Sequence, residues 1–334
     1  MQKLRNSQTL LALGAVLITS AVCSAATASD AEPADKHWSE WDTVKVAAAQ
    51  VSIHTGTEGD EIVDYIDRAG EDDVQLLVLG EYILGKFPSD NPLESEVVKR
   101  ASDAAKRNHI YVMVGGWEEF EPGALDALIP EGYANTVLIF GRDGEIVGRY
   151  SKTHGAVGGV SKYCWPPGAK DAEWVMKEGD TFPTFQLDFA RVGIMICYDG
   201  FFPECATSLS LNGAEIVCWL NGRAGPIEDF IVKADIFRNY CAMVTCNLSP
   251  GSGTMIGTWP ATILAHITEP GNHYIEADID LKTLREYRAN SRTLHQRKPQ
   301  IYGAITESHK PWEAYIPYGH VEAPVPELPV NKNN

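Results

Sequence analysis

Three reactive side chains follow apolar segments of the chain at the points where strands are expected to end. Glu81 comes after "LLVLG", Lys152 after "IVGRYS", and Cys197 after "VGIMI". Functional sites of open α/β sheets assemble beyond the carboxyl ends of the strands, so these side chains can converge on one rim. A glutamate can accept the proton of a thiol, a thiolate is a strong nucleophile, and an ammonium stabilises the anion that forms on an attacked carbonyl. The pattern predicts nucleophilic catalysis by Cys197, with the amide N–H of Tyr198 as a second donor to the oxyanion.

Each of these side chains also has a structural interpretation. Cysteine is one of the most frequently buried residue types, so a lone cysteine at a strand end, such as Cys197, is more often an inert core residue than a nucleophile. Glu81 fits a solvated loop and Lys152 fits the exposed end of a strand. Residue type and spacing alone leave both interpretations open.

Short apolar runs alternate with helix-like segments along the chain. This order predicts an α/β fold with helices outside and sheets inside. A hairpin is expected around Asp143-Gly144, and an amphipathic helix over 92–108 with Leu93, Val97 and Ala101 on its apolar stripe. The other expected strands are 44–53, 74–82, 110–116, 189–197, 215–220, 242–247, 261–267 and 274–280, and the other expected helices are 60–69, 205–214 and 227–240.

The N-terminal residues have the layout of a secretory signal peptide. Two basic residues, Lys3 and Arg5, precede an apolar run and then the small residues "CSAATAS". The apolar run is too short to span a bilayer, which disfavours an uncleaved anchor. Lipidation at Cys23 is disfavoured because the bulky Val22 precedes it. An exported protein, periplasmic or secreted, is expected.

The chain is therefore divided into four parts. Residues 1–26 are the predicted signal peptide, 27–43 a linker, 44–298 the catalytic domain and 299–334 a Pro-rich C-terminal arm. The exact cleavage site stays open among several small residues.

Composition excludes several classes of partner. The net charge is −17, and removal of the signal peptide, which carries two positive charges and no negative ones, makes it −19. A chain with this much negative charge repels nucleic acids and anionic membrane surfaces. The nine histidines and seven cysteines are scattered without the close spacing of a zinc site, so neither a metal nor a cofactor is expected.

Four motifs, in this order, resemble those of the carbon–nitrogen hydrolases, the nitrilase superfamily. They are "LLVLGEY", "YANTVLIFGRDGEIVGRYSKTH", "ARVGIMICYDGFFPE" and "RTLHQRKPQIYGAI", and the resemblance spans about 44–305. It implies a four-layer α-β-β-α sandwich and at least a homodimer, paired through the helical face next to the nucleophile. It also implies Cys197 as nucleophile, Glu81 as general base and Lys152 as the cation that stabilises the oxyanion.

The resemblance extends to further carboxylates and contains one departure. It implies a second glutamate after the lysine, for which Glu173 is the candidate and Glu178 the solvated-loop alternative. Glu118 in "GGWEE" is expected to be structural. Gly80 stands where the family usually has a proline before the base.

Two side chains are candidates for the substrate pocket. Asn221 in "WLNGRAGP" is placed to hydrogen-bond an amide, and Trp165 to line a narrow pocket, although an aromatic side chain is as consistent with a core or dimer contact.

The expected reaction is hydrolysis of a C–N bond other than a peptide bond, with a small amide as substrate. Tyr198-Asp199 after the cysteine resembles amidases and carbamoyl hydrolases more than true nitrilases. The alternatives left open are N-carbamoyl amine hydrolysis, nitrile hydrolysis, acyl transfer to an amine, and a catalytically inactive binding module.

Overall fold

The computed structural model describes residues 37–52, 59–121, 132–156, 173 and 176–307. The predicted signal peptide, most of the C-terminal arm and Trp165 lie outside the described residues. Among the described residues no helix is both long and apolar enough to cross a membrane.

The first sheet contains seven strands in the described part of the chain, in the order β13-β1-β2-β4-β5-β6, with the short β3 beside β4. Strands β1, β2 and β4 run parallel, whereas β4, β5 and β6 form an antiparallel meander. The strands are β1 (Thr43–Gln50), β2 (Leu76–Leu79), β3 (Lys86–Pro88), β4 (Tyr111–Glu119), β5 (Tyr133–Phe140), β6 (Ile146–Ser151) and β13 (His273–Asp280).

The second sheet contains six described strands in the order β12-β11-β10-β9-β8-β7. Its centre is the parallel set β8, β9 and β10, whose strands are buried along nearly their whole length, as expected for strands covered on both faces. The strands are β7 (Thr184–Gln186), β8 (Arg191–Ile196), β9 (Ile216–Leu220), β10 (Ala242–Cys246), β11 (Met255–Thr258) and β12 (Thr262–His266).

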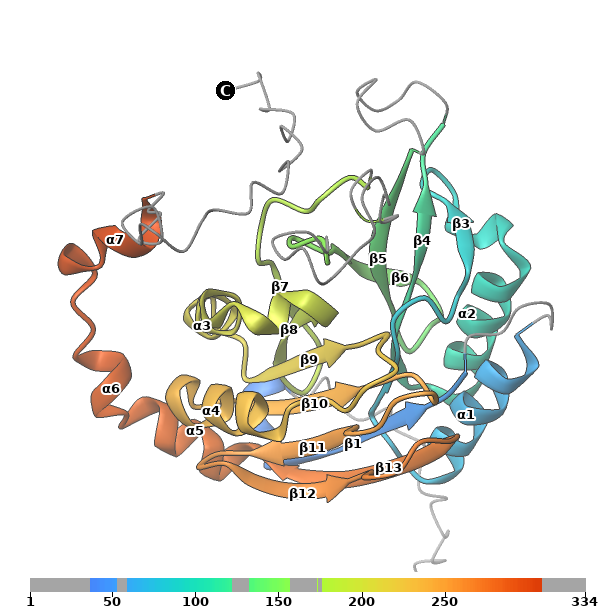
Figure 1. The fold of residues 1–334 in the computed structure, drawn as a ribbon. Helices are drawn as coiled ribbons and strands as arrows, with labels where there is room; N and C mark the ends of the chain where they lie inside the picture. Colours follow the sequence, from blue (N-terminus) through green and yellow to red (C-terminus); the bar gives the residue numbers. More distant parts are fainter. Residues whose placement is uncertain (1–36, 53–58, 122–131, 157–172, 174–175, 308–334) are drawn as a thin grey trace, which may run out of the picture. The chain divides into compact units, whose positions relative to one another are not determined.

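Helices cover the outer face of each sheet (Figure 1). One apolar cluster joins α1 and α2 to the first sheet, and another joins α3 and α4 to the second. A third cluster fills the space between the sheets, with Val46 and Val78 from one and Ile194 and Cys218 from the other. The α-helices are α1 (Asp60–Glu71), α2 (Glu96–Asn108), α3 (Pro203–Leu211), α4 (Asp229–Asn239), α5 (Leu281–Ala289), α6 (Arg292–His295) and α7 (Gly303–Thr306), and the 3₁₀ turns are Trp38–Glu40, Pro92–Glu94, Cys197–Phe201 and Pro299–Ile301. The expected α-β-β-α sandwich is therefore confirmed.

The two parallel sets bring their carboxyl ends together. Strand β1 packs next to β10 across the interface, and the backbone N–H of Glu81, just after β2, donates to the carbonyl of Asn221, just after β9, at 3.2 Å. The segments after β2, β8 and β9 consequently meet at one edge, as the strand-end argument predicts.

The expected helix over 92–108 is wrong in its first turn. Pro92–Glu94 forms a separate 3₁₀ turn, and α2 starts at Glu96 after Ser95, which has extended backbone angles. As a result Leu93 is 37% exposed, and the buried face of α2 is formed by Val98, Ala101, Ala104 and Ala105. Strands β3, β7 and β11 and helices α5, α6 and α7 were not predicted. The three strands are only three or four residues long, which is too short to show a clear period.

Candidate active site

Cys197 begins the 3₁₀ turn that follows β8, and its backbone is in the left-handed region with φ of 42°. For a residue with a Cβ this conformation costs about 1–2 kcal/mol, so the surroundings must hold it. Two contacts do so: the indole N–H of Trp219 donates to the Cys197 carbonyl at 2.9 Å, and the Asp199 carboxylate accepts from the N–H of Ile196 at 3.0 Å. The sharp strand-to-turn transition carries the cysteine out of the sheet.

Asp199 also joins this turn to the segment that carries Lys152. Its buried carboxylate accepts from the Tyr150 hydroxyl at 2.8 Å, the Thr153 hydroxyl at 2.8 Å and the backbone N–H of His154 at 3.0 Å. The Asp199 side chain thus links residues on both sides of Lys152 to the turn that carries Cys197.

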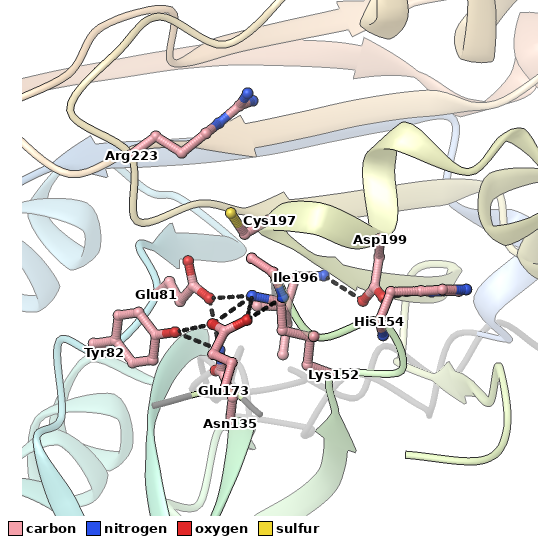
Figure 2. Close-up of polar contacts among 12 residues, drawn as sticks. Glu81, Tyr82, Asn135, Lys152, His154, Glu173, Ile196, Cys197, Asp199 and Arg223 are labelled. Atoms are coloured by element: carbon pink, nitrogen blue, oxygen red, sulfur yellow. Dashed lines mark hydrogen bonds and ion pairs between the residues drawn. The ribbon is translucent and has the colours of Figure 1, made fainter. Parts of the chain in front are cut away.

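Lys152 lies buried between two carboxylates (Figure 2). Its Nζ is 3.1 Å from Oε1 of Glu81, and 2.7 and 3.0 Å from the two carboxylate oxygens of Glu173. The side chains of Lys152, Glu81 and Glu173 are 0, 2 and 8% exposed. We call these three residues the charged group. Paired burial of this kind is expected when charges are placed away from water.

Neighbouring polar groups fix the orientation of both carboxylates. Nδ2 of Asn135 donates to Glu81 at 2.6 Å and to the Tyr82 hydroxyl at 2.9 Å. That hydroxyl donates to Glu173 at 2.5 Å, and the Tyr82 ring stacks on Trp117 with ring centroids 4.1 Å apart. Asn135 and Tyr82 therefore connect the two glutamates on the side opposite the ammonium.

Glycine makes room for the base on its remaining side. A Cβ added to Gly222 would come within 2.6 Å of Oε2 of Glu81, and one added to Gly115 within 3.0 Å of its Cα. The backbone of the segment after β9 can approach Glu81 because position 222 has no side chain.

Burial and charge set the protonation of the site. Burial raises the pKa of Glu81, and the Lys152 ammonium opposes that rise only in part. Burial and then the Glu81 charge raise the pKa of Cys197 to about 12, with the charges of Lys152 and Arg223 acting in the opposite direction. Burial lowers the pKa of Lys152, but the negative charges of Glu81, Cys197 and Glu173 outweigh it, so the net shift is upward. The resting site thus holds a neutral thiol beside an unusually basic carboxylate and a permanent cation.

The structure brings the predicted triad together. In Figure 2 the Cys197 sulfur lies next to the charged group, and the charges of Glu81 and Lys152 both act on its pKa. Glu173 belongs to the charged group, whereas Glu178 is exposed. Glu118 accepts hydrogen bonds from Ser89, Thr136 and Arg149, in keeping with a structural role.

The two described candidates for substrate binding lie in different settings. Asn221 is fully buried, and while its Nδ2 donates to the Trp219 carbonyl at 3.0 Å, its Oδ1 has no hydrogen-bond partner among the described residues. The Tyr198 ring is 36% exposed and packs against Phe201 and Phe202, while its backbone N–H, the predicted second donor to the oxyanion, directly follows Cys197 in the 3₁₀ turn.

Sequence reasoning missed four residues of the site: Tyr82, Asn135, Asp199 and Arg223. Tyr82 directly follows Glu81, and Asp199 lies two residues after Cys197. Their closeness in sequence to predicted catalytic residues could have identified them. Asn135 lies opposite Lys152 in the hairpin, with the Lys152 N–H donating to its carbonyl at 2.9 Å. Arg223 could not have been identified in this way, because it is distant in sequence from Cys197 and only the folded chain brings its charge near the thiol.

One group of metal-ligand types occurs among the described residues. His154, Asp199 and Cys205 place ligand atoms within 4.8 Å of one another. The carboxylate of Asp199 is already engaged by the donors described above, and His154 Nδ1 is itself 3.0 Å from it. The arrangement fits a hydrogen-bonded cluster that supports the nucleophile turn.

Comparison with known proteins gives concordant results. The carbon-nitrogen hydrolase family model matches residues 45–289. Nitrilase homolog 2 of Dictyostelium discoideum is 29% identical over 260 residues, which are 72% of this chain and 75% of the relative. Deaminated glutathione amidase of Escherichia coli O157:H7 is 26% identical over 282 residues, 77% of this chain and 99% of the relative. A carbon-nitrogen hydrolase structure from Helicobacter pylori G27 has the same fold, with a TM-score of 0.63, 18% identity, and coverage of 80% of this chain and 99% of that one.

Proposed function

Because this chain belongs to the carbon–nitrogen hydrolase family and is a hydrolase of C–N bonds other than peptide bonds, we propose that it cleaves a small amide through a thioester on Cys197. The observation that carries this proposal is the buried Lys152 ammonium held between Glu81 and Glu173 beside the thiol. The relationship to an amidase over 99% of that relative's length supports an amide as the substrate.

In the first half-reaction Glu81 accepts the thiol proton while the sulfur attacks the amide carbon. This transfer leaves the total charge of the site unchanged, and the raised pKa of Glu81 makes the carboxylate a better acceptor. The oxyanion is held by Lys152 and the amide N–H of Tyr198. The C–N bond then breaks, Glu81 returns its proton to the leaving nitrogen, and ammonia or an amine departs from the thioester.

In the second half-reaction water replaces the departed amine. Glu81 removes one proton from the water as its oxygen attacks the thioester carbon, and the C–S bond breaks. The carboxylic acid is released, and the thiolate of Cys197 recovers a proton from Glu81. Glu173 and Tyr82 act by holding Lys152 and one another in place.

Asn221 is suited to orient the amide nitrogen. Its buried Oδ1, which has no hydrogen-bond partner among the described residues, can accept one N–H of a primary amide, and the backbone carbonyl of Asn221 already accepts from the N–H of Glu81. Asn221 would therefore place the leaving group next to the base that protonates it.

The test is ammonia release from a panel of simple amides, N-carbamoyl amines and nitriles. We expect turnover of at least one amide, with loss in Cys197→Ala and a fall of at least about 100-fold in Glu81→Gln. Lys106→Gln, on the exposed part of α2, is the control and should match the wild type. Exclusive turnover of a nitrile or a carbamoyl compound, or unchanged rates in Glu81→Gln, would contradict the proposal.

Thiol labelling gives a readout that does not depend on the substrate. Cys197 is partly exposed, whereas the other described cysteines are buried, so iodoacetamide should modify Cys197 first. Labelling should slow in Glu81→Gln because the proton acceptor is lost. A binding module with an inert cysteine would show neither the selectivity nor this dependence.

We further propose that the chain is exported after removal of its N-terminal residues. The support is the basic start, the short apolar run and the small residues that follow. Intact-mass measurement of the protein recovered from the periplasm or medium should show loss of 25 to 28 residues. Full-length protein confined to the cytoplasm would contradict this proposal.

A further inference from the structure

Trp219 packs against the turn that carries the nucleophile. It belongs to β9, which pairs in parallel with β8, the strand that leads into this turn. Leu220 faces the space between the two sheets, whereas Val217 and Trp219 face helices α3 and α4. The Trp219 side chain is fully buried there, and its indole N–H donates to the Cys197 carbonyl at 2.9 Å.

The turn has a glycine where the indole lies closest to it. A Cβ added to Gly200 would come within 2.1 Å of Cζ2 and 2.2 Å of Cε2 of Trp219. The φ of Gly200 is outside the left-handed region, so the close approach of the ring, and not the backbone conformation, requires glycine at this position. The ring contact and the hydrogen bond together fix the indole relative to Cys197.

The carbonyl that Trp219 binds belongs to the same peptide unit as the proposed oxyanion donor. A peptide unit is planar, and the one between Cys197 and Tyr198 is trans, so its C=O and N–H point in opposite directions. A contact that fixes the Cys197 carbonyl therefore fixes the direction of the Tyr198 N–H as well. A hydrogen bond to a carbonyl also polarises the peptide unit, which makes its N–H a stronger donor.

Asp199 and Trp219 hold different peptide units of the turn. The Asp199 carboxylate accepts from the N–H of Ile196, which precedes the nucleophile. The indole binds the carbonyl of Cys197 itself, in the peptide unit that follows the sulfur-bearing Cα. Asp199 therefore positions the end of β8, whereas Trp219 acts on the oxyanion donor.

We propose that Trp219 is a positioning residue for the oxyanion site. Its indole N–H, through the Cys197 carbonyl, orients the Tyr198 N–H toward the oxygen of the attacked amide. This inference rests on the proposed amidase function. Trp219 does not touch the substrate, and its contribution arises only as negative charge develops on that oxygen. Its loss should therefore lower kcat and leave KM nearly unchanged.

Trp219→Phe removes the donor and keeps an aromatic ring in the core. For the amide that is turned over fastest, we expect kcat to fall about 10- to 100-fold, no more than the loss of a whole oxyanion donor costs. KM should change less than about threefold, because the backbone carbonyl that accepts from Nδ2 of Asn221 at 3.0 Å is retained. Trp259→Phe is the matched control, because its indole donates to the Phe237 carbonyl at 3.3 Å at the surface, and it should retain the wild-type kcat.

Alkylation of the thiol distinguishes the oxyanion site from a general disturbance of the turn. Iodoacetamide reacts at its methylene carbon with displacement of iodide, so the reaction needs the thiolate but no oxyanion donor. In Trp219→Phe the rate of Cys197 alkylation should stay within about threefold of the wild-type rate while kcat falls. If the indole only supported the turn, its loss would displace the thiol and slow both reactions alike.

A tetrahedral adduct tests the oxyanion site through affinity. The aldehyde that corresponds to the fastest amide can accept the Cys197 sulfur at its carbonyl carbon, with the thiol proton passing to the oxygen, and this oxygen then lies at the oxyanion position. Inhibition by the aldehyde should weaken in Trp219→Phe by about the factor by which kcat/KM falls. Calorimetric binding of the amide itself should be the same in Cys197→Ala and Cys197→Ala/Trp219→Phe.

Gly200→Ala tests the same contact from the side of the turn. The added methyl group would displace the indole, so kcat should fall as it does in Trp219→Phe. In the double variant the second change should cost less than about threefold, because the contact is already lost. Thermal unfolding of each variant verifies that the fold is retained.

The outcomes separate the two proposals. An unchanged kcat in Trp219→Phe, equal losses of kcat and alkylation rate, or an unchanged affinity for the aldehyde overturns this inference and leaves the amidase proposal intact. Absence of ammonia from every amide, with Cys197→Ala indistinguishable from the wild type, overturns the amidase proposal and this inference together.

Discussion

At the scale of single residues, the charged group combines two carboxylates with one ammonium away from water. The raised pKa of Glu81 means that the fold favours its neutral form, so its charge at neutral pH costs stability. Lys152 has the opposite role, because its removal would leave two buried carboxylates without their cation. The charge of Glu81 therefore lowers the stability of the fold, whereas the charge of Lys152 raises it.

This difference gives a prediction for unfolding. Glu81→Gln should leave the free energy of unfolding at pH 7 equal to or slightly above that of the wild type, within about 1 kcal/mol, while abolishing turnover. Lys152→Met should lower it by about 3–5 kcal/mol. Urea unfolding followed by tryptophan fluorescence measures both, and the exposed Lys99→Met, whose pair with Asp103 is at the surface, is the control. A destabilised Glu81→Gln would contradict the assigned electrostatics.

The raised pKa of Glu81 also predicts the pH dependence of the reaction. The base acts only when ionised, so kcat/KM should fall as the pH drops through a pKa above the ordinary 4.5 of a glutamate. No alkaline decline is expected from Cys197 or Lys152 while the protein stays folded, because both pKa values are raised. Asn135 donates to Glu81 and lowers its pKa, so Asn135→Ala should move the acid limb to higher pH. An acid limb that stays in place in Asn135→Ala would indicate that another group controls it.

At the scale of elements, the segment after β9 approaches the base more closely than a side chain would permit. Gly222→Ala would bring a methyl group within 2.6 Å of the Glu81 carboxylate, so the carboxylate must shift from its present position. We expect kcat to fall at least about 10-fold, since small displacements of catalytic groups are costly. Gly225→Ala is the matched control, because it lies in the same segment and a Cβ there meets nothing within 4 Å.

Steady-state kinetics of Gly222→Ala and Gly225→Ala test whether the position of the Glu81 carboxylate is critical. Both glycines lie outside the left-handed region, so backbone strain does not distinguish them. Equal activity of the two would show that the carboxylate accommodates the methyl group and that its position is not critical.

The elements also show what the sequence could predict. The ends of the buried parallel strands indicated where Glu81 and Cys197 would lie, because such strands are continuous apolar runs with a clear end. The hairpin register was available as well: extending a tight turn at Asp143-Gly144 back along the strands places Asn135 opposite Lys152. In the structure Gly141 pairs with Glu145, which makes the loop one residue longer, and an irregularity at Ile139/Phe140 restores that register.

What the sequence could not predict depends on contacts between distant segments. The charge of Arg223 near Cys197 and the hydrogen bond from Tyr82 to Glu173 exist because separate loops meet above the sheet edge. Neither residue has a local pattern that distinguishes it from other arginines or tyrosines. Glu173 was chosen over Glu178 from the resemblance, and only the fold placed its carboxylate against Lys152.

At the scale of the whole molecule, the two helical layers have different outer surfaces. Helix α4 exposes Phe230 and Phe237, at 68 and 59%, and these residues lie seven apart on one face of the helix. Leu211 at the end of α3 and Tyr287 on α5 are also exposed, at 50 and 44%. Neither α1 nor α2 exposes a large apolar side chain among the described residues. Apolar exposure concentrated on one layer indicates an interaction surface.

We expect this α3–α4 layer to pair two copies of the chain, as the sequence resemblance implied. The turn of Cys197 leads directly into α3, so pairing here would steady the element that carries the nucleophile. The double variant Phe230→Asp/Phe237→Asp should sediment as a monomer at micromolar concentration, where the wild type sediments as a dimer or larger, and should lose activity as it dissociates. Val147→Asp, 47% exposed on β6 of the other sheet, is the control and should leave the assembly unchanged. A wild-type monomer, or a double variant that still pairs, would assign this apolar surface to another partner.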